Sequence, residues 1–72
     1  MRQNNLRRIR RSHNISMMGL SVVSSVSTST IVGIEKYNHY PEPSTREKLS
    51  RALRVSEREI WPNKAKVEND GK

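Results

Sequence analysis

The side chains best suited to chemistry in this sequence are arginines, because five of them lie within the first 13 residues and no acid lies among them. These are Arg2, Arg7, Arg8, Arg10 and Arg11. A guanidinium group is always charged and donates hydrogen bonds in a planar fork that matches phosphate oxygens. Without an anion nearby, the positive charges of so dense a cluster repel one another. The segment predicts a polyanionic partner, nucleic acid ahead of an acidic membrane surface, with an ordinary solvated face as the alternative.

The whole chain shares this basic character, since 14 Lys and Arg against seven Asp and Glu give a net charge of +7 over 72 residues. A chain of this length forms one small domain that buries only about 60% of its unfolded surface. The absence of cysteine excludes disulfides and thiolate metal sites. The two histidines, His13 and His39, have no cluster of further ligands around them, so we expect no metal and no cofactor.

The sequence offers little for catalysis or for membrane insertion. Its single aspartate, Asp70, lies near the C-terminus, and neither a cysteine nucleophile nor a glycine-rich phosphate loop is present. No apolar run approaches the roughly 18–20 residues that span a bilayer. No apolar segment follows the N-terminal arginines, as a signal peptide requires. We therefore expect a soluble cytoplasmic protein that is not an enzyme, has no membrane partner and takes no small-molecule substrate.

A segment without any charged side chain follows the arginines. Residues 12–34 contain no Lys, Arg, Asp or Glu, and nine of these 23 residues are Ser or Thr. Apolar side chains nevertheless recur through the segment, at Ile15, Leu20, Val26 and Ile31. A flexible linker has no need of them. We therefore predict that this segment is folded.

A first helix is predicted to begin at Asn4 or Asn5, because the side-chain oxygen of either can accept a backbone N–H of the opening turn. Leu6 and Ile9 share one face of this helix, and arginines cover the rest. Asn14 is a residue type that ends helices in the left-handed conformation. The arginines are thus expected on the outside of one short helix.

Serines divide the uncharged segment into two further helices. Ser16 is expected to cap a helix over about 17–24. After a three-residue break, Ser27 or Thr28 begins a third helix, over about 28–36.

Two capping boxes, in which Ser and Glu stand three residues apart, predict the last helices. Ser44 with Glu47 is expected to begin the fourth helix, and Ser56 with Glu59 the fifth, which ends before Pro62. Trp61 is expected to fill the core and not to stack on bases, because single-strand binders need several aromatic residues.

These five helices, without any strand-like alternation, place the chain in the all-α class. We expect one domain over 1–62 and a flexible C-terminal tail over 63–72. Within the domain, a basic helix precedes two short helices that a three-residue break joins. This is the order of elements in a helix-turn-helix DNA-binding domain.

Three stretches of the sequence resemble the phage-repressor-like (Xre/Cro) family: LRRIRRSHNIS over 6–16, SMMGLSVVSSVSTSTIVGIEKY over 16–37 and TREKLSRALRVSEREIWP over 45–62. The resemblance implies a compact five-helix lambda-repressor-like helix-turn-helix fold. It implies sequence-specific binding of double-stranded DNA by a transcriptional regulator, most simply a repressor. It also implies a homodimer on a palindromic site, joined around residues 54–61, in a cytoplasmic, nucleoid-associated bacterial protein or one that a phage or plasmid encodes.

The third helix of this family reads the bases. If Ile31 and Ile34 face the core, a rotation of 100° per residue puts five residues on the groove-facing side. Four are the candidate base-contacting residues Thr28, Ser29, Val32 and Gly33, and the fifth is Lys36. Hydroxyls can bond several bases, and methyl groups can contact that of thymine. Because none of these side chains makes a bidentate contact, and family members often carry a long polar side chain where Gly33 stands, we expect modest specificity.

Phosphate contacts are expected around that helix. The residues are Arg7, Arg11, Ser16, Met17, Lys36, Asn38 and His39. The two arginines belong to the basic cluster, and the next two stand at a helix start, where backbone amides hold anions. The last three lie at the end of the third helix and in the loop that the family lays along the DNA backbone. By the same resemblance, Arg10 forms a structural ion pair with Glu35.

The second helix carries an unusual apolar surface. Met17, Met18, Val22 and Val23 are expected to lie largely outside in this register. A contiguous apolar surface of this kind marks a site for a partner. The alternative function is therefore a protein-interaction module, such as an adaptor or antitoxin, that uses the surface of the second helix.

Overall fold

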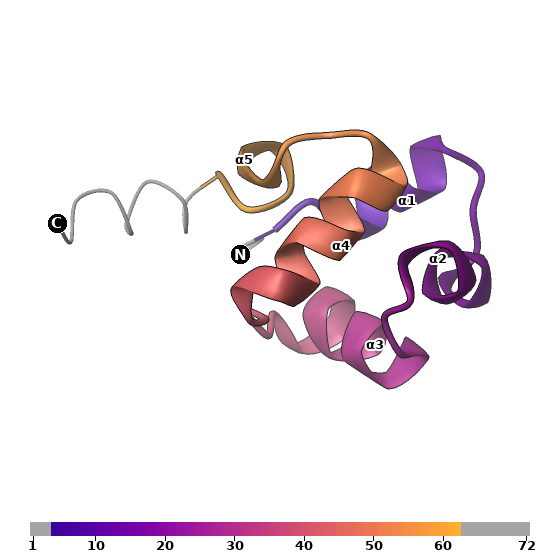
Figure 1. The fold of residues 1–72 in the computed structure, drawn as a ribbon, viewed down its shortest axis with the longest axis horizontal. Helices are drawn as coiled ribbons and strands as arrows, with labels where there is room; N and C mark the ends of the chain where they lie inside the picture. Colours follow the sequence, from indigo (N-terminus) through magenta and orange to yellow (C-terminus); the bar gives the residue numbers. More distant parts are fainter. Residues whose placement is uncertain (1–3, 63–72) are drawn as a thin grey trace, which may run out of the picture.

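The computed structural model describes residues 4–62. These residues form five α-helices and contain no strand (Figure 1). The helices are α1 (Leu6–Ser12), α2 (Met17–Ser24), α3 (Thr28–Tyr37), α4 (Pro43–Leu53) and α5 (Glu57–Ile60). The all-α prediction is confirmed for this part of the chain. The tail predicted for 63–72 and the side chain of Arg2 lie outside the described residues.

The helices pack around one apolar core to which every helix contributes. α4 lies in the middle of Figure 1, with α5 above it and α3 below it, and α2 packs against both α3 and α4. The buried apolar side chains are Leu6, Ile9, Leu20, Val26, Ile31, Ile34, Leu49, Leu53, Ile60 and Trp61. Full burial of such a side chain stabilises the fold by about 1.5–3 kcal/mol. The inward positions predicted for α1 and α3 are therefore part of the core.

Three of the predicted serine caps are present. Ser16 Oγ accepts the N–H of Gly19 at the start of α2, and Ser27 Oγ accepts that of Thr30 at the start of α3. Ser56 forms the predicted capping box with Glu59 at α5. Each cap satisfies a first-turn amide that the helix itself leaves without a partner. The starts of these helices thus follow from their local sequence.

The predicted start of α4 is wrong. The N-cap lies two residues earlier, at Glu42, which makes no side-chain cap bond, and the first helical residue is Pro43. Proline fits the first helical position because its φ is already helical and the N–H that it lacks would have no intrahelical partner there. Ser44 is consequently inside the helix and does not form a box with Glu47.

The start of α1 combines both asparagines. Asn5 holds the capping position without a side-chain cap bond, while Asn4 Oδ1 accepts the N–H of Leu6 at 3.0 Å. Asn4 also donates its amide N–H to the carbonyl oxygen of Ile34 at 3.0 Å. One buried asparagine therefore ties the start of α1 to the end of α3. Asn14 has a φ of 56°, as its predicted left-handed conformation requires.

The turn between α2 and α3 is the predicted three-residue break, Ser25 to Ser27. Ser25 adopts the left-handed conformation with a φ of 62°. The buried Ser24 hydroxyl donates to the carbonyl oxygen of Leu20 at 2.6 Å and accepts the N–H of Val26 at 3.2 Å. These two bonds fix the direction in which the chain leaves α2 and enters α3.

Replacing Ser25 by Gly is expected to stabilise the fold by about 0.5–1 kcal/mol. The left-handed conformation costs a non-glycine residue roughly 1–2 kcal/mol, and glycine's larger unfolded-state entropy offsets about 0.4–1 kcal/mol of that. The matched control is Ser21→Gly inside α2, which is expected to destabilise the fold by a similar amount. Urea unfolding measures both variants. Equal destabilisation by the two would contradict the strain at Ser25.

Candidate nucleic-acid interface

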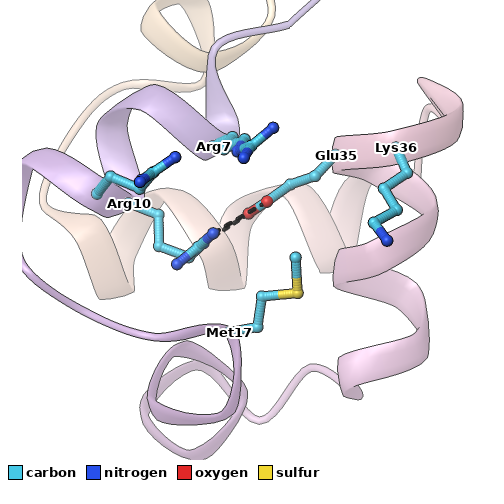
Figure 2. Close-up of a pocket in the computed structure, with 6 residues that line it drawn as sticks. Arg7, Arg10, Met17, Glu35 and Lys36 are labelled. Atoms are coloured by element: carbon cyan, nitrogen blue, oxygen red, sulfur yellow. Dashed lines mark hydrogen bonds and ion pairs between the residues drawn. The ribbon is translucent and has the colours of Figure 1, made fainter.

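A bidentate ion pair joins α1 to α3 beneath the basic surface. Arg10 Nε lies 2.7 Å from Glu35 Oε2, and Arg10 Nη2 lies 3.1 Å from Glu35 Oε1 (Figure 2). The third nitrogen, Nη1, donates to the carbonyl oxygen of Ile15 at 2.8 Å. The two side chains are only 10% and 1% exposed. The residues that the resemblance pairs are thus joined by two hydrogen bonds, and a third ties Arg10 to the backbone of Ile15.

A hollow of about 360 Å³ opens above this pair. Its lining residues are Arg7, Arg10, Arg11, Met17, Glu35 and Lys36. In Figure 2, Arg7 projects from α1, Lys36 from α3 and Met17 from the start of α2. Four cationic side chains against one carboxylate give a formal charge of +3. We call this site the cationic hollow.

The charges of the cationic hollow fall into two groups. Glu35 is the one acid in the lining, and both of its oxygens bond Arg10. The lining therefore offers no second carboxylate to Arg7, Arg11 or Lys36, all three of which are exposed. A phosphate has both the charge and the acceptor oxygens that such side chains bind. The hollow can thus hold an anion from outside the chain.

The start of α2 forms one wall of the hollow. Met17 is half-buried against the core, so the expectation that it lies largely outside is wrong. Ser16 is exposed, and its hydroxyl is occupied as the helix cap by the N–H of Gly19 at 2.9 Å. The amide of Met17 belongs to the first-turn groups that attract anions. Of the two predicted phosphate contacts, Met17 thus lines the hollow, and Ser16 directly precedes it in the chain.

The predicted base-contacting residues lie on α3 beside this site. Ile31 and Ile34 are fully buried, whereas Thr28 and Ser29 are exposed in the first turn. Val32 and Gly33 are half-buried on the following turn. The side of α3 away from the core therefore presents two hydroxyls at its start, then Val32 and Gly33, and the exposed side chain of Lys36 near its end.

The loop after α3 holds the remaining predicted contacts. Asn38 is exposed and left-handed, with a φ of 57°, and its Oδ1 accepts from Asn4 Nδ2 at 3.1 Å. His39 is exposed, and its backbone N–H donates to the carbonyl oxygen of Gly33 at 3.0 Å. The side chain of Asn38 is thus partly engaged inside the chain, while the imidazole of His39 remains at the surface.

Two positioning residues were not found by sequence reasoning. Asn4 donates to the carbonyl oxygen of Ile34 and to Asn38 Oδ1, both at the C-terminal end of α3. Arg46 lies over the ring of Tyr40 at 4.5 Å and bonds the carbonyl oxygen of Pro41 at 2.8 Å and Glu57 Oε1 at 3.0 Å. Both hold the loop that follows α3. No periodicity or cap signals such contacts, because the partners come from distant parts of the sequence.

No family model matches the chain, and no curated protein matches it in sequence. Within residues 4–62, no three His, Cys, Asp or Glu side chains group as metal ligands do. In the same range no helix has the length and apolar character to cross a membrane.

Proposed function

We propose that this chain binds double-stranded DNA as a lambda-repressor-like helix-turn-helix domain and regulates transcription, most simply as a repressor. The observation that carries the proposal is the cationic hollow, whose exposed cations have no second acid in the lining. Duplex DNA carries one negative charge about every 1.7 Å along its axis, so its phosphates can supply the anions that pair with these cations.

The arrangement of α2 and α3 supports the same proposal. A three-residue turn joins the helices, and α1 packs behind α3. In the proposed complex, α3 enters the major groove with its first turn nearest the bases, and the cationic hollow sits over the phosphates. Two copies on a palindromic site would place their α3 helices about 34 Å apart.

Base readout in this complex comes from Thr28, Ser29, Val32 and Gly33. Their hydroxyls and methyls can favour some base pairs, but none offers the bidentate contact that carries about 1–3 kcal/mol of discrimination. Backbone charge therefore supplies most of the affinity, and sequence preference is modest.

Selection from a random duplex pool tests whether a preferred site exists. We expect the wild-type chain to enrich one sequence family and Thr28→Ala to bind that site less tightly while keeping its affinity for random duplex. The loss of affinity stays below that of a bidentate contact, which is worth about 1–3 kcal/mol, or about fivefold to 150-fold. Failure to enrich any sequence would leave only non-specific DNA binding in the proposal.

Gly33→Ala is expected to stabilise the chain while weakening its binding to DNA. A methyl group there would meet only His39 Cβ, at 3.7 Å, so the fold has room for it. Glycine inside a helix costs about 0.5–1 kcal/mol relative to alanine. The added methyl would, however, occupy space on the groove-facing side of α3. Urea unfolding and fluorescence anisotropy with a labelled duplex measure the two effects.

The matched control is Gly19→Ala in α2. A methyl there would stand 3.0 Å from Ile15 Cγ1 and 3.2 Å from Ser16 Oγ, so the same helix-propensity gain is opposed by crowding. We expect no comparable rise in stability. If Gly33→Ala raised stability and affinity together, Gly33 would not face the DNA.

A second candidate function is a protein-interaction module, which the exposed side chains of Met18, Val22 and Val23 favour. An affinity for a protein partner that does not change with salt concentration would favour this second function, since the affinity for DNA through the cationic hollow falls as the salt concentration rises.

A further inference from the structure

The outer side of α2 carries three large apolar side chains that the protein leaves in water. Met18 is 71% exposed, Val22 75% and Val23 59%. Met18 and Val22 are four residues apart and lie on the same side of the helix, and Val23 follows about 100° farther round it. We call this surface the α2 face. Exposed large apolar side chains that lie close together mark a site for a partner, and within residues 4–62 nothing covers these three.

The charge pattern limits what can cover the α2 face. No charged side chain lies between residues 12 and 34, so the face offers no cation to DNA or to an acidic protein. Two copies of a chain with a net charge of +7 repel each other over most of their surface. At the α2 face, a second copy brings an equally apolar and uncharged surface, and no like charges are opposed there.

The segment that the family resemblance assigns to dimer contacts is poorly suited to that role. Ile60 and Trp61 are buried in the core of their own chain. Arg54 and Arg58 remain exposed there, and a symmetric contact would bring such charges together. The apolar area that two copies could share lies on α2 instead.

The size of the α2 face determines when copies can meet. Three side chains fall far short of the roughly 800 Å² per partner that a stable complex buries, so we expect no stable dimer in free solution. α2 packs directly against α3. A copy bound through α3 therefore holds its α2 face close to the duplex. Neighbours on one duplex experience about millimolar effective concentrations, which lets a weak contact form.

We infer that the α2 face joins two copies that bind side by side on one DNA duplex, so that binding is cooperative. This inference rests on the proposed DNA-binding function. The occupant is a second copy of this chain, and the contact is apolar and independent of salt. DNA brings the two copies close to each other, and the contact between their α2 faces stabilises the pair.

The double variant Val22→Thr with Val23→Thr tests the contact, because threonine keeps the shape and net charge while reducing apolar surface. Anisotropy would follow binding to a short duplex with room for one copy and to a longer duplex with room for two. For wild type, we expect the second copy to bind about 5-fold to 150-fold more tightly than the first. The double variant should bind the short duplex normally and the longer one without cooperativity.

The control is Val22→Ile, which keeps the face apolar and should remain cooperative. Wild-type binding without cooperativity, or equal cooperativity in wild type and double variant, would overturn the inference and leave the face to another protein. The proposed function survives those results, because the short duplex is still bound. If wild type bound neither duplex, the proposed function would fail and the inference with it.

Discussion

Replacing Arg10 by Met is expected to unfold most of the protein at room temperature, without any DNA. Glu35, at 1% side-chain exposure, would lose its bidentate partner and remain buried as a charge. Removing one member of a buried pair costs about 3–5 kcal/mol. A core of this size rarely supplies more than about 3–5 kcal/mol in total. Glu35→Gln, which leaves the buried guanidinium without its anion, should act in the same direction.

Far-UV circular dichroism on heating measures this effect. The matched control is Arg51→Ala, which breaks the surface pair with Glu47, whose side chains are 78% and 57% exposed. Exposed pairs contribute little to stability, so the melting curve of this control should stay close to that of wild type. A double variant, Arg10→Met with Glu35→Leu, should regain part of the lost stability because no buried charge remains. Melting near wild type in both single variants would contradict a structural role for the ion pair.

Replacing Arg7 and Arg11 together by Ala is expected to lower the affinity for any DNA duplex by about 100-fold. Each exposed guanidinium of the cationic hollow can make a charge-assisted hydrogen bond to phosphate, which is worth at least about 1.5 kcal/mol. That value corresponds to about tenfold in affinity for each side chain. Because the contacts are with phosphate, the loss should be equal for the preferred site and for random duplex.

Anisotropy titrations of both duplexes measure this loss. The control variant Arg51→Ala removes one positive charge from α4, outside the residues that line the hollow. It should change the affinity much less than either Arg7→Ala or Arg11→Ala. If all three single variants weakened binding equally, net charge and not the hollow would account for the affinity.

The parts of the fold that sequence reasoning predicted are those set within one helical turn. Ser16, Ser27 and Ser56 cap helices through bonds to residues three positions onward. The apolar spacing of Ile31 and Ile34 likewise fixed the buried side of α3. Such features depend only on residues that are close in the sequence, so a local sequence pattern is enough to predict them.

The errors arose where two signals competed or where distant residues met. Ser44 looked like a cap, but the preference of Pro43 for the first helical position moved the helix start. Met17 is half-buried because it packs against core residues that come from other parts of the sequence. Asn4 reaches Ile34 across 30 positions of the sequence. A periodicity or a cap describes one element at a time and cannot register such contacts.

The most direct test of DNA binding is the salt dependence of the affinity for a random duplex, followed by anisotropy between about 50 and 200 mM salt. Each neutralised phosphate contributes about −0.9 to the slope of log affinity against log salt concentration. Arg7, Arg11 and Lys36 therefore predict a slope of about −2.7 for one bound copy and about −5.4 for two copies. A slope near zero, or no binding at micromolar protein with the chain folded, would contradict the account.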